Sequence, residues 1–334
     1  MAAKKTVKRR PAPVGKKAKK KPAASDNLVE AWQDDPRGLG TVQRPVPDLN
    51  RPPLRFKIKG PAVPPGIYPL GTPEFRYWTA AEALRRGGDF WAPLLGVKHW
   101  QPGPVLPVGL DEGEDINAYY DRTELAFFHG KADGKVVYSG ESPDIVCHEM
   151  GHACLDALRP QLWDAPFVEA GAFHESFGDM SAILSALQLP SVRSAALNGV
   201  KLHKPSVLSR LAEQLGWAIR QTHPADADPD CLRNAFNDFQ YVDPQTLPDS
   251  APACQHSAEV HSFSRVFTGA FYDLLSAMLK IQSGTPTEAD LDAVATDCGK
   301  LLVVATAAAP VTPHFLAPQQ NLWVNSGSGR SPSV

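Results

Sequence analysis

The segment SPDIVCHEMGHACLDAL, residues 142–158, decides how this sequence is interpreted. Ser142 is a favoured helix N-cap and Pro143 a favoured first helical residue, so a helix is predicted to follow. Within that helix His148 and His152 are four residues apart, which puts them on one face, one turn from each other. Both imidazoles can therefore point at the same ion.

This spacing is typical of a zinc site. Zinc accepts neutral imidazole nitrogen, and a catalytic zinc needs three protein ligands plus an open position. Glu149 follows the first histidine, where its carboxylate can take a proton from water at the metal. Because His-Glu-x-x-His fixes only three positions, unrelated chains also carry it by chance. The prediction therefore depends on a third ligand.

A second predicted helix, Glu169–Gln188, offers three acids for that role: Glu169, Glu175 and Asp179. Glu175 and Asp179 share a face, so one can bind the metal while the other accepts the free ring N–H of a ligand histidine. The alternative is an ordinary solvated helix face. Apolar neighbours disfavour that alternative, because buried carboxylates need partners. These neighbours are Phe173, Phe177, Met180, Ile183 and Leu184.

Upstream of these helices the chain is rich in proline. Seventeen of the 32 prolines fall in residues 1–107, so one short helix around Thr79–Arg86 is expected there and no long one. Strands are predicted over Ile116–Tyr120, Glu124–His129 and Lys135–Tyr138, which are rich in β-branched and aromatic residues.

Downstream, the pattern is helical. Helices are predicted near Ser206–Gln221, over Ala258–Ile281, and from a capping box at Thr285-Pro286-Thr287-Glu288 towards Ala308, with a loop region over 222–257. This order predicts an α+β protein of two lobes with a cleft between them. The predicted divisions are a basic disordered tail (1–26), a proline-rich, β-rich N-terminal lobe (27–141), a helical zinc-binding catalytic lobe (142–325) and a disordered tail (326–334).

Several segments together carry a resemblance to a known family. They are Asn117-Ala118-Tyr119-Tyr120, Ser139-Gly140, Asp144-Ile145-Val146, the run from His148 to Ala153, and the run from Glu169 to Glu175 followed by Asp179. This stretch resembles the thermolysin-like zinc metalloendopeptidases, the gluzincins, whose third ligand is a glutamate. The resemblance implies a two-lobed thermolysin-like fold with the active-site helix between the lobes. It also implies one catalytic zinc on His148, His152 and Glu175, with Asp179 supporting a ligand histidine and Asp156 as a further family match.

The resemblance extends over roughly residues 110–310 and implies further roles. Leu232-Arg233-Asn234 is similar to the family segment whose arginine holds a substrate carbonyl, and Val260-His261 to the one whose histidine stabilises the tetrahedral intermediate. Taken alone, Arg233 has the alternative of a surface or salt-bridging residue, and His261 that of a satisfied core histidine. Their order after the zinc motif and their separation favour the functional roles. Asn117 and Ala118 resemble the edge strand with which the family pairs its substrate backbone.

The chain departs from the family pattern at four positions. Trp163 stands where a tyrosine donates to the oxyanion, so it can donate only through its indole N–H. His174 replaces the asparagine before the third ligand, and His256 replaces the acid that orients the catalytic histidine, so that orientation must come from elsewhere. Ala186 stands where a calcium-binding acid would sit. Asp144 alone does not make a calcium site, so no calcium is expected.

Charge and composition limit the partners. Residues 1–25 carry ten Lys or Arg and no acid, which leaves 24 basic and 36 acidic residues in the rest of the chain. An acidic body disfavours nucleic-acid binding. The basic run is typical of a solvated, disordered leader, and the alternative is contact with an anionic partner such as nucleic acid or a membrane surface. No transmembrane segment is expected. No apolar segment follows the basic run and the five cysteines show no paired spacing, which predicts a cytoplasmic protein.

The sequence therefore predicts a zinc metalloendopeptidase that acts on a peptide or protein substrate. Glu149 is expected to serve as general base and His261 as oxyanion donor, with Trp163 as a second candidate donor. The alternative is a catalytically weakened zinc protein that serves as a binding module or acts on one dedicated partner. The family departures favour this alternative, but a protein without catalysis has no chemical need for Glu149, which is not a ligand.

Overall fold

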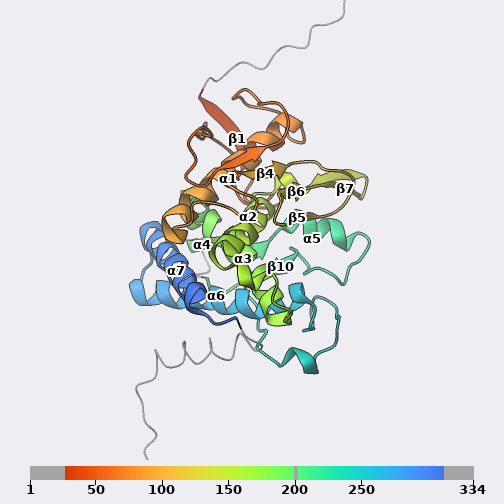
Figure 1. Ribbon diagram of the computed structural model, residues 1–334, viewed down its shortest axis with the longest axis vertical. Helices are drawn as coiled ribbons and strands as arrows, with labels where there is room; N and C mark the ends of the chain where they lie inside the picture. Colours follow the sequence, from red (N-terminus) through yellow and green to blue (C-terminus); the bar gives the residue numbers. More distant parts are fainter. Residues whose placement is uncertain (1–26, 199–201, 312–334) are drawn as a thin grey trace, which may run out of the picture.

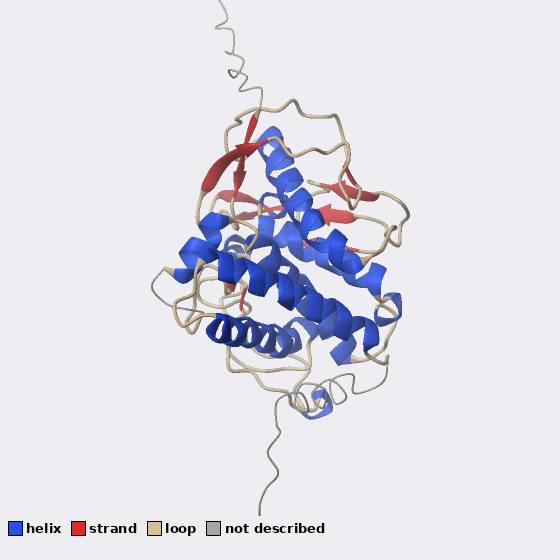
Figure 2. Cartoon of the chain, turned by 90° about the vertical axis from the view of Figure 1, so that its left-hand side faces the viewer, coloured by secondary structure: helices blue, strands red, loops and turns tan. Residues whose placement is uncertain are grey.

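The computed structural model describes residues 27–198 and 202–311. The predicted tail segments 1–26 and 326–334 lie outside these residues. The chain is a mixed α+β protein, as the sequence predicts. Most strands gather at one end of the molecule together with the first helix, and the last two helices lie at the other end (Figures 1 and 2).

The first part of the chain holds most of the strands. They are β1 (Leu28–Trp32), β2 (Thr41–Pro45), β3 (Phe56–Ile58), β4 (Leu106–Gly109), β5 (Ala118–Tyr120), β6 (Leu125–Phe127), β7 (His129–Ala132) and β8 (Lys135–Tyr138). One four-stranded sheet has the order β3-β4-β6-β5, with β5 antiparallel at its edge. The pairs β1–β2 and β7–β8 are separate antiparallel ribbons.

The helices follow, with one exception. They are α2 (Pro143–Leu158), α3 (Val168–Ala186), α4 (Pro190–Leu197), α5 (Glu213–Arg220), α6 (Val260–Gln282) and α7 (Glu288–Ala308), with the short pair β9 (Arg210–Leu211) and β10 (Arg233–Asn234) between them. The exception is α1 (Pro73–Leu95), which lies among the N-terminal strands in sequence. In space α2 and α3 lie at the centre, between the N-terminal strands and the pair α6 and α7 (Figure 1).

Helix α1 corrects the expectation of a single short helix before residue 107. Its 23 residues contain proline only at the two ends. Pro73 takes the first position, where the N–H would be unpaired anyway, after the capping hydroxyl of Thr72, and Pro93 falls in the last turn. Burial stabilises the helix between them, because Trp91 is fully buried and stacks on Phe177 of α3 at 5.1 Å.

The predicted helix over Ser206–Gln221 is also wrong in its first half. Ala212 adopts a left-handed conformation (φ 52°) before α5 begins, so no helix can run through it. Arg210 and Leu211 pair instead with Arg233 and Asn234 as β9–β10. Gly216 allows this approach, because a Cβ there would lie 2.3 Å from the backbone at 231–232.

Other helix boundaries follow local signals closely. The Ser142 hydroxyl accepts the Ile145 N–H at the start of α2. At α7 the capping box is formed by Thr287 and Asp290, so Pro286 precedes the cap and does not take the first helical position as predicted. Pro190, two residues after the predicted end of the second helix at Gln188, begins α4.

A main hydrophobic core joins most of these elements, and a small separate cluster of Ala132, Val137 and Ala218 packs β7 and β8 against α5. The buried side chains of the main core run from Val29 in β1 to Ala309 after α7, and it includes residues of α1, α2, α3 and α6. The predicted division at residue 141 therefore falls within a continuous core. None of the helices in the described part of the chain is both long and apolar enough to cross a bilayer.

Candidate metal centre

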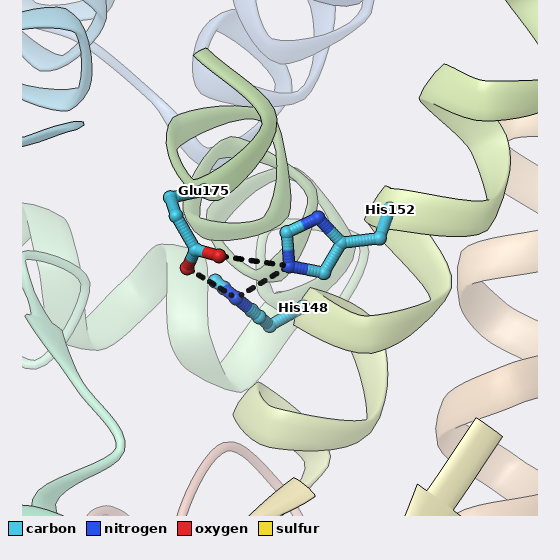
Figure 3. Close-up of side chains that lie close together, drawn as sticks. All are labelled: His148, His152 and Glu175. Atoms are coloured by element: carbon cyan, nitrogen blue, oxygen red, sulfur yellow. Dashed lines mark hydrogen bonds and ion pairs between the residues drawn. The ribbon is translucent and has the colours of Figure 1, made fainter. Parts of the chain in front are cut away.

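Helices α2 and α3 bring two histidines and a glutamate together. The Nε2 atoms of His148 and His152 lie 3.1 Å apart, and Glu175 of α3 lies 3.4 Å from the first and 3.6 Å from the second (Figure 3). All three donor atoms lie within 4.8 Å of one another. This is the trio that the sequence resemblance implies.

Glycines let the two helices approach closely enough. A Cβ at Gly178 of α3 would lie 2.6 Å from the His148 ring, and one at Gly151 of α2 would lie 2.6 Å from the Ser181 hydroxyl. Small residues at the crossing therefore leave room for the imidazole between the helices.

The other nitrogen of each histidine has a partner on α3. His148 Nδ1 lies 3.0 Å from Asp179 Oδ1, and His152 Nδ1 lies 3.2 Å from His174 Nδ1. A carboxylate accepts only, so His148 donates from Nδ1 and keeps its Nε2 lone pair for a metal. For His152 to donate from Nδ1 and keep its Nε2 lone pair in the same way, His174 must accept that hydrogen bond through its own Nδ1. Burial lowers the pKa of His174 to about 4, which favours that neutral, accepting form.

Asp179 links the histidine to an arginine. Arg233 of β10 donates from Nη2 to Asp179 Oδ1 at 2.7 Å and from Nε to Oδ2 at 3.1 Å. Burial alone would raise the pKa of Asp179, but the Arg233 charge and the His148 hydrogen bond outweigh it and lower the pKa to about 2. Asp179 therefore stays ionised. Glu169, the remaining acidic candidate on this helix, instead accepts a hydrogen bond from the Tyr241 hydroxyl.

Glu149 lies beside the trio on the wall of a cavity of about 790 Å³. Its side chain is largely buried, and this burial raises its pKa to about 7, with the nearby Glu175 charge adding to the shift and His148 opposing it. A carboxylate in such surroundings can exchange a proton near neutral pH.

His261 reaches the same cavity from the first turn of α6. Its Nε2 lies 3.4 Å from Glu175 Oε2, and its Nδ1 lies 2.5 Å from Glu259 Oε1. Glu259 is the N-cap of α6, and its other oxygen accepts the Ser262 N–H at 2.9 Å. Burial lowers the pKa of His261, but the Glu175 and Glu259 charges outweigh it and raise the pKa overall.

Glu259 is a residue that the sequence analysis missed. The predicted helix starts at Ala258, which puts Glu259 inside it, whereas the helix in the structure begins at Val260. An acidic side chain at an N-cap is a known sequence signal for the start of a helix. It can be recognised only when the first residue of the helix is known exactly. His256, at the family position of the orienting acid, instead stacks on Phe263 at 5.0 Å.

Trp163 and Asp156 both contact Tyr120, the last residue of β5. Trp163 lines the cavity and packs edge-on against His174 (5.3 Å) and Tyr120 (5.4 Å). Asp156 accepts from the Tyr120 hydroxyl at 2.9 Å and from Arg122 at 2.7 Å. Its carboxylate therefore anchors the end of β5 to α2, and its hydrogen bonds go to these two residues and not to the trio.

Strand β5 forms the other wall of the cavity. Residues 116–120 line it, and β5 pairs with β6 on one side only, as the edge of its sheet. The Asn117 carbonyl accepts from the Ser139 hydroxyl at 2.7 Å, which fixes the start of the strand. Arg233 and Leu232 line the cavity as well. An extended chain bound there could add a strand to the sheet.

No protein-family model matches this chain, and no curated protein matches it. Its function must therefore be inferred from the residues of the site.

Proposed function

We propose that this chain is a zinc-dependent metalloendopeptidase with a two-lobed thermolysin-like fold. His148, His152 and Glu175 would hold the zinc, and Glu149 would act as general base. The observation that carries this proposal is the convergence of the three donor atoms beside a buried carboxylate and an edge strand.

The donor set suits zinc. Two imidazole nitrogens and one carboxylate form a three-ligand set of the kind that catalytic zinc sites use, with room for a fourth position. The Nδ1 atom of each histidine already has a hydrogen-bond partner, which leaves the Nε2 lone pairs to bind the metal. Such outer hydrogen bonds orient metal ligands and support affinity.

A bound zinc ion would polarise the substrate carbonyl and lower the pKa of water at the site. Glu149 then takes a proton from the attacking water and passes it to the leaving amine. His261 donates from Nε2 to the carbonyl oxygen as negative charge develops there, and Glu259 holds the ring at Nδ1. Trp163, on the same wall, is a second candidate donor through its indole N–H.

The remaining site residues would hold the substrate. Asn117 and Ala118 present an edge strand to which an extended peptide can hydrogen-bond through its backbone. Arg233 lies on the cavity wall with its guanidinium fixed by Asp179, where it would donate to a substrate carbonyl. Backbone recognition of this kind selects extended chains, so an unfolded polypeptide is the preferred substrate.

The test is proteolysis of a denatured protein by the purified chain. We expect fragments that disappear with a chelator and return on addition of zinc. Full cleavage in a large excess of chelator, in protein shown by elemental analysis to be metal-free, would refute the proposal. Bound zinc with no cleavage of any denatured or native protein would favour the binding-module alternative.

A further inference from the structure

Arg265 of α6 is a cationic side chain that is almost completely buried. It lies one helical turn after His261 and lines the large cavity, yet it is only 4% exposed. Arginine is almost never fully buried unless its charge and its N–H groups have partners. The partners of this guanidinium therefore indicate what the residue does.

The guanidinium binds main-chain carbonyls of the loop before α6. Nη1 donates to the Ala253 carbonyl, and Nη2 donates to the Gln255 carbonyl at 2.9 Å. Nη2 also donates to the Ser262 hydroxyl at 3.0 Å, and Nε donates to the Ser262 carbonyl at 3.2 Å. One guanidinium thus connects two carbonyls of the loop to the first turn of the helix.

An aromatic ring packs against the plane of the guanidinium. The Arg265 group lies over the Phe239 ring at 4.0 Å. Phe239 also contacts the ring of His256, the residue of the loop that follows Gln255. Stacking on a ring and donation to several carbonyls together require a planar fork of donors, which arginine has and lysine lacks.

Residues 248–257, the rim loop, form no helix or strand. The Ala258 N–H donates to the Pro248 carbonyl at 2.8 Å and closes the loop at its base, and the Ala253 N–H donates to the Ala225 carbonyl at 2.7 Å. The rim-loop residues that line the cavity are Ser250, Ala251 and Ala253. This part of the cavity wall therefore has no helix or sheet of its own to hold it.

The rim loop leads directly into the cap of α6. Glu259, which holds His261 at Nδ1, follows the loop after one intervening residue. The Ser262 hydroxyl, an acceptor for Arg265, also accepts from the Ser257 N–H at 3.1 Å. Arg265 and Ser262 therefore hold the end of the rim loop against the helix that carries His261.

We propose that Arg265 is a positioning residue of the peptidase, which fixes the rim loop in the conformation that receives the substrate. This inference rests on the proposed function. A loop that is already ordered binds more tightly than one that must be ordered when the substrate arrives, because ordering costs free energy. The hydrogen bonds of Arg265 go to the rim loop and to α6. Its loss should therefore weaken substrate binding and leave the zinc ligands on α2 and α3 unchanged.

The test is Arg265→Lys, which keeps the positive charge but not the planar fork. With fluorescein-labelled, denatured casein as the probe, we expect KM to rise about tenfold and kcat to stay within about twofold. A binding contribution shared by the ground state and the transition state changes KM alone. Zinc content should be unchanged. Hydrogen exchange of the rim-loop amides should become at least about tenfold faster, with α2 and α3 unaffected.

Arg193→Lys is the matched control. Arg193 of α4 also donates to a main-chain carbonyl, that of Leu187 at 2.6 Å, and pairs with Asp292, but it lies outside the residues that line the cavity. Its substitution should leave KM and rim-loop exchange unchanged. Ser262→Ala removes a hydroxyl that binds both Arg265 and the rim loop, so it should shift both quantities in the same direction by a smaller factor.

A zinc-loaded Glu149→Gln background separates this inference from the proposed function. Binding of the labelled casein to that protein, measured by fluorescence anisotropy, needs no turnover and should become about tenfold weaker with Arg265→Lys. The inference is overturned if Arg265→Lys leaves this affinity or the rim-loop exchange unchanged, or if Arg193→Lys changes them as much. Absence of cleavage by the unmodified chain, with both shifts present, would refute the peptidase proposal alone.

Discussion

Replacing His174 by phenylalanine tests whether the ring partner of His152 supports the metal. Phenylalanine keeps an aromatic ring where His174 now stacks on His152 at 5.4 Å and contacts Trp163 edge-on. It removes both ring nitrogens of His174, of which only Nδ1, 3.2 Å from His152 Nδ1, has a hydrogen-bond partner among the described residues. The substitution therefore preserves the packing and deletes the hydrogen bond that fixes the tautomer of His152.

The expected changes in zinc affinity and in stability follow from the hydrogen bonds that the substitution removes. Loss of an outer hydrogen bond to a metal ligand costs about 10- to 100-fold in metal affinity, which is about 1.4–2.7 kcal/mol. The stability of the metal-free protein should change little. His174 Nε2 is already buried without a partner among the described residues, and the variant exchanges that unpaired nitrogen for an unpaired Nδ1–H on His152.

The assay is competition for zinc against a chromophoric chelator, with urea unfolding of the metal-free proteins beside it. His174→Asn is the matched control, because its side-chain oxygen can still accept from His152, so its zinc affinity should stay near that of the unmodified chain. The reasoning is refuted if the phenylalanine variant binds zinc as tightly as the asparagine variant.

Three further outcomes follow from the same structure. Asp179→Asn removes the nearer of the two carboxylates that face the half-buried Arg233 and leaves only Glu175, 4.0 Å away, so urea unfolding of the metal-free protein should show a loss of about 1.5–3 kcal/mol, the worth of a hydrogen bond to a charged group; a loss below about 1 kcal/mol would contradict this. Glu259→Gln retains a cap for α6 but removes the charge beside His261, so kcat should fall about tenfold, a part of what a positioned proton donor contributes, with KM and zinc content unchanged. Burial raises the folded-state pKa of Glu213 to about 10 from 4.5, so its contribution to stability is present at low pH and is lost as pH rises above 4.5. The melting temperature of metal-free Glu213→Gln, relative to that of the unmodified chain, should therefore increase between about pH 5 and 8. A difference in melting temperature that stays constant over this range would contradict the raised pKa of Glu213.

Local signals predicted the central helices well. The cap at Ser142 and the four-residue spacing of His148 and His152 are both contained in one helical segment, so no tertiary information is needed to place them. The same holds for the shared face of Glu175 and Asp179. These four side chains meet in the structure because the helical period puts each pair on one face and the two helices cross at glycines.

Features that depend on exact boundaries or on distant contacts were not predictable. The many prolines before residue 107 argued against a long helix there. Pro73 and Pro93, however, lie near the two ends of α1, where proline costs the helix little stability. The role of Glu259 depends on a helix start displaced by two residues from the expected one. The buried acids Asp35, Asp144 and Glu213 also come together in the structure, although no sequence period connects them.

The most direct test of the central claim is cleavage of a denatured protein by the unmodified chain and by Glu149→Gln, with zinc counted in the same samples. We predict one zinc per chain in both proteins and chelator-sensitive fragments from the unmodified chain alone, because Glu149 moves the proton but does not bind the metal. Absence of zinc from both proteins, or equal cleavage by both, would contradict the account.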